Sequence, residues 1–194
     1  MPLQNRVDPL GELFATPARG TLMGNRGGRF HTDDRTLTTR RWASRQWICC
    51  VLDFKNRQRD VWGRYYTELF FLDEVTALAA GHRPCGECRR PFYRAFVDAA
   101  NVGNENPIAG AKDLDAQLKS SRSAARSAAP IGTLPNGVFV IYADGRAAVR
   151  TSATYKADGK AARWATQSGP MLLVDGKLNA QFVDDSSSLK WRSG

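Results

Sequence analysis

Long apolar runs are missing from this chain, and their absence limits where the protein can work. Its 194 residues hold no stretch approaching the roughly 20 apolar residues that span a bilayer. The N-terminus, MPLQNRVDPLGELF, lacks the apolar core of a secretory signal. We therefore expect a cytoplasmic protein with no membrane partner.

Cysteine is also scarce, with four residues in the whole chain. A disulfide framework needs a higher density of cysteine than this, and a cytosol keeps thiols reduced. The cysteines are therefore expected to bind a metal or to be buried as small apolar side chains.

Lysine is nearly absent from the first half of the chain, although the protein is basic, with a net charge of +9. Residues 1–95 contain 16 Lys+Arg against 10 Asp+Glu, and 15 of those 16 cations are arginine. The planar guanidinium matches a phosphate, which the lysine ammonium does not. Such a domain can bind nucleic acid nonspecifically, or its charge can simply keep the surface soluble.

The pattern of residues predicts a mixed α+β chain. Residues 1–30 indicate irregular backbone with turns, while 46–54 and 64–72 are typical of strands joined as a hairpin. A short helix is expected from an Asp73 cap to a Gly81 stop. A second helix should begin after Cys88 and end near Gly103, with an apolar face made of Phe92, Ala95, Phe96 and Ala99.

The later sequence divides the chain into three parts. Residues 1–103 are expected to form a small zinc-ribbon-like or treble-clef-like domain, and 104–132 a helix and linker. Residues 133–194 are expected to form a β-hairpin-rich part, with hairpins at GVFVIYADGRAAVR and MLLVDGKLNAQF.

The stretch GHRPCGECRR, residues 81–90, carries the clearest chemical signal. A C-x2-C pair supplies half of a tetrahedral zinc site, and Cys85 and Cys88 have this spacing just before a helix. The helix N-terminus and the adjacent arginines favour thiolates. The sequence therefore predicts that both cysteines bind Zn²⁺.

The remaining ligands are less well defined by the sequence. His31 follows a short β-like run and is the best third ligand. Cys49 and Cys50 are adjacent in a strand, so their side chains point to opposite faces and at most one easily reaches the site. We favour Cys49 over Cys50 as the fourth ligand, although burial as a small apolar side chain is the more common role of a strand cysteine. His82 is expected to pack beside the cysteine turn.

Two catalytic interpretations of the cysteine pair are weaker. A redox C-x-x-C pair needs a βαβ context, which is lacking here. Zinc deaminases combine P-C-x-x-C with H-x-E, but the nearest candidate is His31-Thr32-Asp33, with Asp in place of Glu.

The segment FFLDEVTALAAGHRPCGECRR resembles the second half of the Ada-type metal-binding domain, and GNRGGRFH resembles the entry of Ada-like zinc modules. The resemblance implies that Cys85 and Cys88 form the second ligand pair and His31 the first ligand. Arg35 stands where the family has another ligand, and the methyl-accepting cysteine has no counterpart. The resemblance thus implies zinc binding and contact with nucleic acid, but not methyl transfer.

The last third resembles a different family. LPNGVFVIYADG and ATQSGPMLLVDGKL are similar to segments of the phosphodiester glycosidases, relatives of the lysosomal uncovering enzyme. The matching turn residues are Asn136, Gly137, Ser168, Gly169 and Pro170. The family's "LDGGGS" loop and "NAG" segment have no counterpart, so we expect no intact catalytic centre. The chain is then either a natural fusion or a composite sequence.

These patterns lead to three hypotheses. The first is a Zn²⁺-binding module without catalysis that contacts DNA or RNA. The second is a hydrolase of sugar phosphodiesters, and the third is a structural zinc fold that binds another protein. For the first, the phosphate contacts are expected from Arg26, Arg29, Arg40, Arg41, Arg45, Arg83, Arg89 and Arg90.

Overall fold

In the computed structural model of the protein, the described residues are 1–124, 134, 138–141 and 147–149. Their strands are β1 (Arg6–Val7), β2 (Leu13–Phe14), β3 (Leu22–Arg26), β4 (Trp47–Cys50), β5 (Leu69–Phe71), β6 (Arg83–Pro84), β7 (Phe139–Ile141) and β8 (Ala147–Val149). Their helices are α1 (Glu74–Ala79), α2 (Arg90–Ala100) and α3 (Ala111–Ser123).

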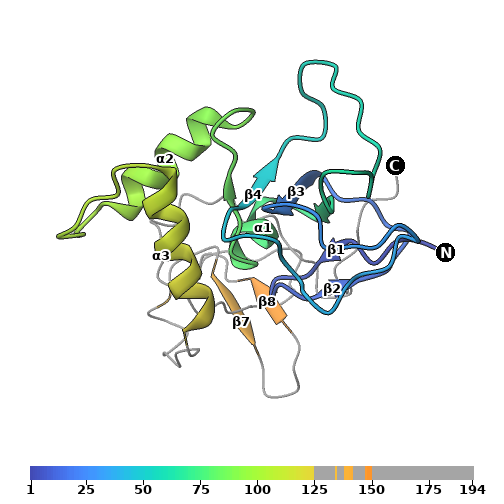
Figure 1. Ribbon diagram of the computed structural model, residues 1–194. Helices are drawn as coiled ribbons and strands as arrows, with labels where there is room; N and C mark the ends of the chain where they lie inside the picture. The colour runs from blue at the N-terminus through green and yellow to red at the C-terminus, as the bar shows by residue number, and fades with distance from the viewer. Residues whose placement is uncertain (125–133, 135–137, 142–146, 150–194) are drawn as a thin grey trace, which may run out of the picture.

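Strands β1 to β6 form one mixed sheet in the order β2-β1-β5-β3-β4-β6 (Figure 1). β1 pairs with β5 and β4 pairs with β6 in parallel, and the other neighbours are antiparallel. The predicted hairpin between 46–54 and 64–72 is wrong, because β3 lies between β4 and β5.

The six-stranded sheet has helices packed beside it, which confirms the α+β class. The small zinc-ribbon or treble-clef-like domain stays a prediction.

The central strand β3 lies in a region expected to be irregular. Its sequence, LMGNR, has little of the β-branched and aromatic character that marks a strand. Gly24 is needed there because a Cβ at this position would lie 2.2 Å from the carbonyl oxygen of Ile48 and 2.8 Å from the Phe71 ring. Because the close approach of Ile48 and Phe71 requires glycine here, β3 lacks the side-chain pattern by which a strand is recognised from the sequence.

Helix α1 forms the middle layer of the protein. Asp73 caps it by accepting a hydrogen bond from the Thr76 amide at 2.8 Å, and Gly81 ends it with φ +80°. Both predicted ends are confirmed. Ala77 and Ala80 pack toward the sheet against Leu69 and Phe71.

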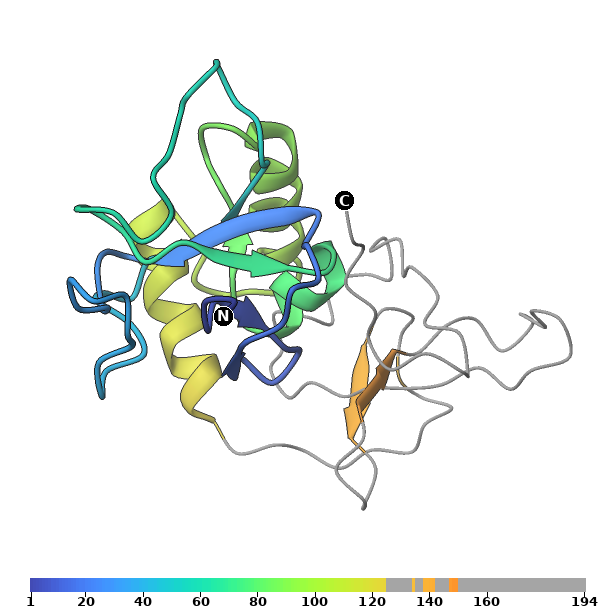
Figure 2. The same ribbon diagram turned by 90° about the vertical axis from the view of Figure 1, so that its right-hand side faces the viewer.

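The opposite side of α1 is covered by the two longer helices and β7 (Figures 1 and 2). Phe96 of α2 and Leu114 and Leu118 of α3 pack there. The predicted face of α2 is wrong in part, since Phe92 is 54 % exposed. Tyr93, Val97 and Ala100 accompany Phe96 instead.

The hairpin predicted at GVFVIYADGRAAVR is confirmed by the antiparallel pairing of β7 with β8. Phe139 of β7 is buried in the cluster with α2 and α3, so this strand shares a core with the residues before the linker. The second predicted hairpin, at 171–182, falls outside the described residues. No helix in the described part of the chain is long and apolar enough to cross a membrane.

Candidate metal centre

Three cysteines from two separate segments meet at the end of β4. The Sγ atoms of Cys50, Cys85 and Cys88 all lie within 4.8 Å of one another. Sulfurs bound tetrahedrally to one zinc at about 2.3 Å are about 3.8 Å apart, so this spacing suits a shared ion. The three cysteines can therefore hold a metal ion.

Parallel pairing of β6 with β4 brings the two segments together. Cys49 pairs with Pro84, and the Cys85 amide donates a hydrogen bond to the Cys49 carbonyl oxygen at 2.9 Å. The chain then turns over the end of β4. The Arg89 amide closes the turn on the Cys85 carbonyl oxygen at 3.1 Å, and α2 begins at the next residue.

Cys50 rather than Cys49 supplies the third sulfur. Successive strand residues face opposite sides of a sheet, and Cys49 faces the core, where it is fully buried beside Leu69 and Phe71. Its Sγ accepts a hydrogen bond from Nη1 of Arg89 at 3.1 Å. Burial raises the pKa of Cys49 to about 12, and Cys49 is not part of the group of three close sulfurs.

The environment of the three sulfurs favours a thiolate on Cys85 and disfavours one on Cys50 and Cys88. A hydrogen bond from Cys50 lowers the pKa of Cys85 to about 5, and the amides of Cys88 and Glu87 contribute to the same shift. The pKa of Cys50 is raised, first by its hydrogen bond with Cys85 and then by burial. Burial also raises the pKa of Cys88. Alone, the cluster thus carries one thiolate, on Cys85, and binding of a divalent cation releases the other protons.

A cationic loop lies beside the cysteine turn. Nη1 and Nη2 of Arg57 bind the Glu87 carboxylate at 3.1 and 2.5 Å, and Lys55 Nζ lies 3.7 Å from it. This arrangement places positive charge next to Cys85 and Cys88. Three thiolates on one Zn²⁺ carry a net charge of −1, which these cations offset.

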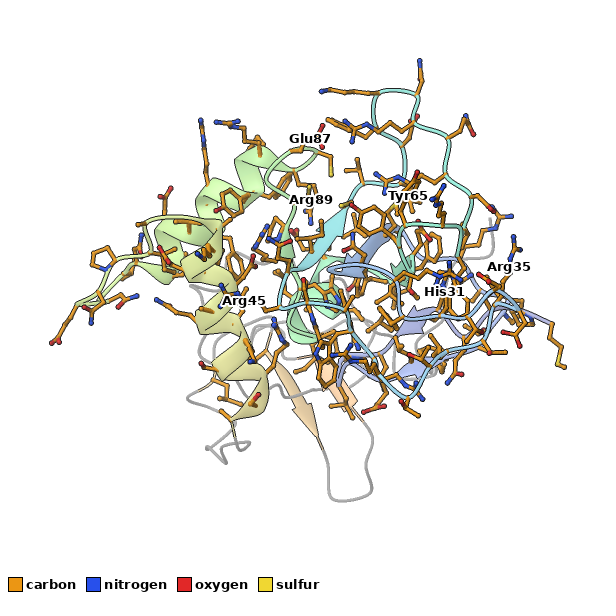
Figure 3. The ribbon with its side chains drawn as sticks, viewed as in Figure 1. His31, Arg35, Arg45, Tyr65, Glu87 and Arg89 are labelled. Atoms are coloured by element: carbon orange, nitrogen blue, oxygen red, sulfur yellow. The ribbon has the colours of Figure 1, made fainter. Side chains whose placement is uncertain are left out.

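His31 does not reach the cysteines. Its Nδ1 is 2.7 Å from Thr67 Oγ1, its Nε2 is 3.1 Å from the Gly63 carbonyl oxygen, and its ring stacks on Trp62 at 5.1 Å. Figure 3 shows His31 and Arg35 well apart from Glu87 of the cysteine turn. Both ring nitrogens are occupied, so this histidine serves the fold. No fourth His, Cys, Asp or Glu among the described residues joins the cluster.

The second histidine packs as expected. His82 is buried, accepts a hydrogen bond from Nε of Arg26 at 3.3 Å, and lies 4.7 Å from the Phe71 ring and 5.0 Å from the Trp47 ring.

Several of the expected phosphate-binding arginines are buried. Arg83 binds both carboxylate oxygens of Asp115, at 2.7 and 3.0 Å. Arg89 binds Glu74 at 2.5 Å, and Arg26 is 2 % exposed. These three side chains attach the cysteine turn and β3 to the rest of the protein and are not exposed on its surface.

The other expected arginines lie nearer to solvent. Arg29 is ion-paired with Asp33 and partly exposed. The exposed members of the set are Arg40, Arg41, Arg45 and Arg90. The glycosidase-like turn residues, Asn136, Gly137, Ser168, Gly169 and Pro170, fall outside the described residues.

Comparison of the chain with protein-family models, curated proteins and solved structures found no match. The Ada-like and glycosidase-like resemblances therefore stay predictions, and function has to be argued from the site itself.

Proposed function

We propose that this protein is a zinc-binding module in which Cys50, Cys85 and Cys88 hold Zn²⁺ as thiolates. The observation that carries the proposal is that three cysteine sulfurs, one from β4 and two from the turn after β6, lie within 4.8 Å of one another. Thiolate ligands select zinc, Cu(I) or iron–sulfur clusters over hard cations. Zinc suits the tetrahedral site, whose fourth position is filled by water or another donor.

The bound ion links parts of the fold that are distant in sequence. It ties the end of β4 to the turn that begins α2, and α2 in turn packs on α1 and α3 through Phe96. A structural zinc site contributes on the order of 10–16 kcal/mol to a small domain. The metal is thus expected to organise the packing of α2 against the sheet.

Nucleic acid is the partner that we propose for this module. Support comes from the net charge of +9 and from three exposed arginines, Arg40, Arg41 and Arg45, in the loop between β3 and β4. Neutralisation of phosphates by such residues releases counterions, so the affinity should fall steeply as salt increases. Binding that does not change with salt, or no binding in the micromolar range, would count against this partner.

Adjacent cysteines offer a matched pair of variants for testing the metal site. The full-length chain, Cys50→Ser and Cys49→Ser are each reconstituted with zinc, separated from free metal, and analysed for zinc and protein. Wild type and Cys49→Ser should retain about one zinc per chain. Cys50→Ser should bind zinc more than about 100-fold more weakly in competition with a chromophoric chelator, since loss of an outer-shell partner alone costs 10- to 100-fold.

Two results would overturn the assignment. One is a wild-type chain that holds no zinc after reconstitution. The other is equal zinc retention by Cys50→Ser and wild type, which would show that the Cys50 sulfur is not a zinc ligand.

A further inference from the structure

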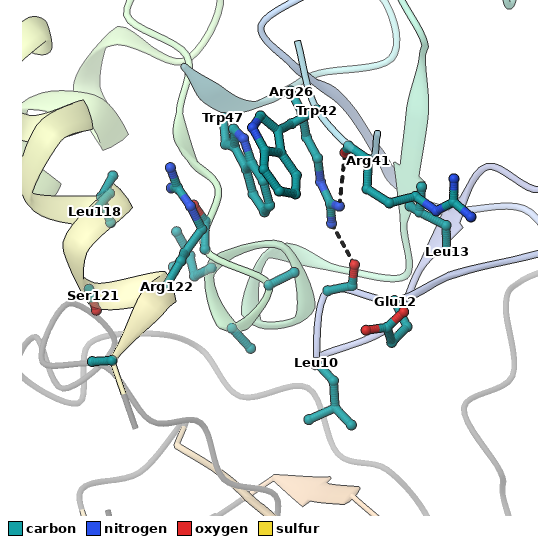
Figure 4. A pocket seen from close by; sticks show the side chains of 16 residues that line it. Leu10, Glu12, Leu13, Arg26, Arg41, Trp42, Trp47, Leu118, Ser121 and Arg122 are labelled. Carbon is teal, nitrogen blue, oxygen red and sulfur yellow. Dashed lines mark hydrogen bonds between the residues drawn. The ribbon is translucent and has the colours of Figure 1, made fainter. Parts of the chain in front are cut away.

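Two adjoining cavities, with volumes of about 400 and 450 Å³, have linings that include none of Cys50, Cys85 and Cys88. They share Trp42, Trp47 and Arg122, and are bounded by the β3–β4 loop and the end of α3. We call this region the tryptophan cleft and define it by its shared residues together with Arg41, Arg45 and Lys119. Figure 4 shows the first cavity, with Trp42, Trp47, Arg41 and Arg122 labelled. The volume of each cavity is sufficient for a ligand about the size of a nucleotide.

An exposed tryptophan forms one wall of the cleft. Trp42 is 50 % exposed, and its ring lies 6.3 Å from the half-buried Trp47 ring at an angle of 47°. The packing of Trp47 against His82 and two arginines explains why that ring is held in place. No comparable structural task occupies Trp42, whose exposed ring can accept a planar group.

The cleft also contains two arginines, Arg26 and Arg122, on which carboxylates act only from beyond ion-pair distance: Glu12 and Asp8 on Arg26, and Asp115 on Arg122. The guanidinium carbons of Arg26 and Arg122 lie 3.9 and 4.2 Å from the centre of the Trp47 ring. Their hydrogen bonds go to neutral acceptors, the carbonyl oxygens of Gly11, Arg41, Gly81 and Arg45 and the ring of His82. Neither arginine forms an ion pair with another described residue.

Burial of these two guanidinium groups disfavours their charged forms, and the pKa values of both arginines are lowered as a result. Burial, with the nearby charge of Arg122, lowers the pKa of Arg26 to about 9. Burial lowers the pKa of Arg122 to about 10. A bound anion would offset this unfavourable charge. Glu12 is the carboxylate among the lining residues, and it lines the first cavity, whereas Arg45 and Lys119 line the second.

Exposed cations line the rim beside the tryptophan. Arg41 and Arg45 come from the same loop as Trp42, and Lys119 projects from α3. None of the three forms an ion pair with another described residue. A stacking platform flanked by unpaired cations is the combination by which proteins bind single-stranded nucleic acid without reading its sequence.

We propose that the tryptophan cleft binds single-stranded nucleic acid, with a base stacked on Trp42 and the flanking phosphates bound by Arg41, Arg45 and Lys119. This inference rests on the nucleic-acid contact of the proposed function and names its site. A single strand is required because a duplex hides the faces of its bases, and only a free face can lie on the indole. The site is separate from the cysteine cluster, so the two can be tested independently.

The test uses the full chain and a fluorescein-labelled oligothymidylate of about 12 nucleotides, followed by fluorescence anisotropy. Trp42→Ala should weaken binding by about 5- to 100-fold, and Trp42→Phe should restore most of it, since phenylalanine also stacks. Tyr65→Ala is the matched control, because Tyr65 is 71 % exposed and lies outside the cleft. It should leave the affinity unchanged.

The rim cations are tested through the salt dependence. Arg45→Gln and Lys119→Gln should each lower the slope of log affinity against log salt by about 0.7, whereas Trp42→Ala should leave the slope unchanged. Arg94→Gln, an exposed arginine on α2, is the charge control. The zinc content of every variant is measured alongside, so that loss of the metal centre cannot be mistaken for loss of the cleft.

The possible failures are distinguishable. Salt-dependent binding that Trp42→Ala and Tyr65→Ala affect equally would overturn the cleft but leave the broader nucleic-acid contact standing. Absence of binding by the wild-type chain would overturn both, without bearing on zinc. Equal affinity for duplex and single-stranded DNA would overturn the stacking of a single strand on Trp42. The same holds if a free mononucleotide or a glutamate-rich peptide competes as well as the unlabelled oligothymidylate does.

Discussion

At the scale of single residues, His82 shows how burial suppresses a charge. It is 1 % exposed between the rings of Trp47 and Phe71. Burial and the neighbouring charges of Arg26 and Arg122 hold the pKa of His82 well below its ordinary value of 6.5. In the unfolded chain the same histidine takes up a proton near pH 6.5.

The consequence is a loss of stability in acid. Below about pH 6.5 the unfolded chain binds a proton that the folded protein does not, so the free energy of unfolding falls as pH decreases, by up to about 1.4 kcal/mol per pH unit. Urea unfolding of wild type and His82→Gln between about pH 6.5 and pH 5 measures this slope. For His82→Gln, the free energy of unfolding should lack the part of the pH dependence that His82 contributes, whatever the absolute stability of the variant. Identical slopes would show that His82 is not held neutral.

The cysteines show which parts of the metal site could be predicted from the sequence and which could not. The C-x2-C spacing of Cys85 and Cys88 is local, and the structure brings the two together as expected. The alternation of a strand also indicated that only one of Cys49 and Cys50 could join them. Which face meets the turn depends on the pairing of β4 with β6, a contact more than 30 residues distant in sequence, and no local pattern encodes it.

At the scale of elements, a buried ion pair joins β6 to α3. Arg83 and Asp115 are 7 % and 1 % exposed and are joined by two hydrogen bonds. Asp115→Ala should destabilise the protein by about 3–5 kcal/mol, because it leaves the Arg83 guanidinium buried without a partner. Chemical denaturation measures the change.

A matched exposed pair supplies the control. Asp60 lies 3.3 Å from Arg35, and both side chains are more than half exposed. Asp60→Ala should cost less than about 1 kcal/mol, since water screens the pair. If the two substitutions cost the same, the Arg83–Asp115 pair does not hold α3 in place.

Some of the helices and strands could be predicted from the sequence, and others could not. Both ends of α1 follow from Asp73 and Gly81, whose roles are local. A helix was expected within 104–132, and α3 lies there (Ala111–Ser123). Strand β3 was missed because Gly24 replaces the side chain that a strand pattern needs. The hairpin across 46–72 was wrong for the same reason, since the strand between its two arms was not recognised.

At the scale of the whole molecule, arginine distribution was the least predictable feature. The sequence shows that cations in the first half are nearly all arginine, but it does not show which of them are buried. Arg26, Arg83 and Arg89 serve the interior, while Arg41 and Arg45 stand beside Trp42 on the surface. Burial of a guanidinium depends on partners such as Asp115 and Glu74, which tertiary packing alone supplies.

The cysteine cluster is the centre of this account, and zinc-edge X-ray absorption of the reconstituted full-length chain tests it most directly. Three thiolates from Cys50, Cys85 and Cys88 predict about three sulfur neighbours at about 2.3 Å, with one lighter donor completing the shell. Cys50→Ser should lose one sulfur, and Cys49→Ser none. A shell of nitrogen and oxygen alone, or an unchanged sulfur number in Cys50→Ser, would contradict the account.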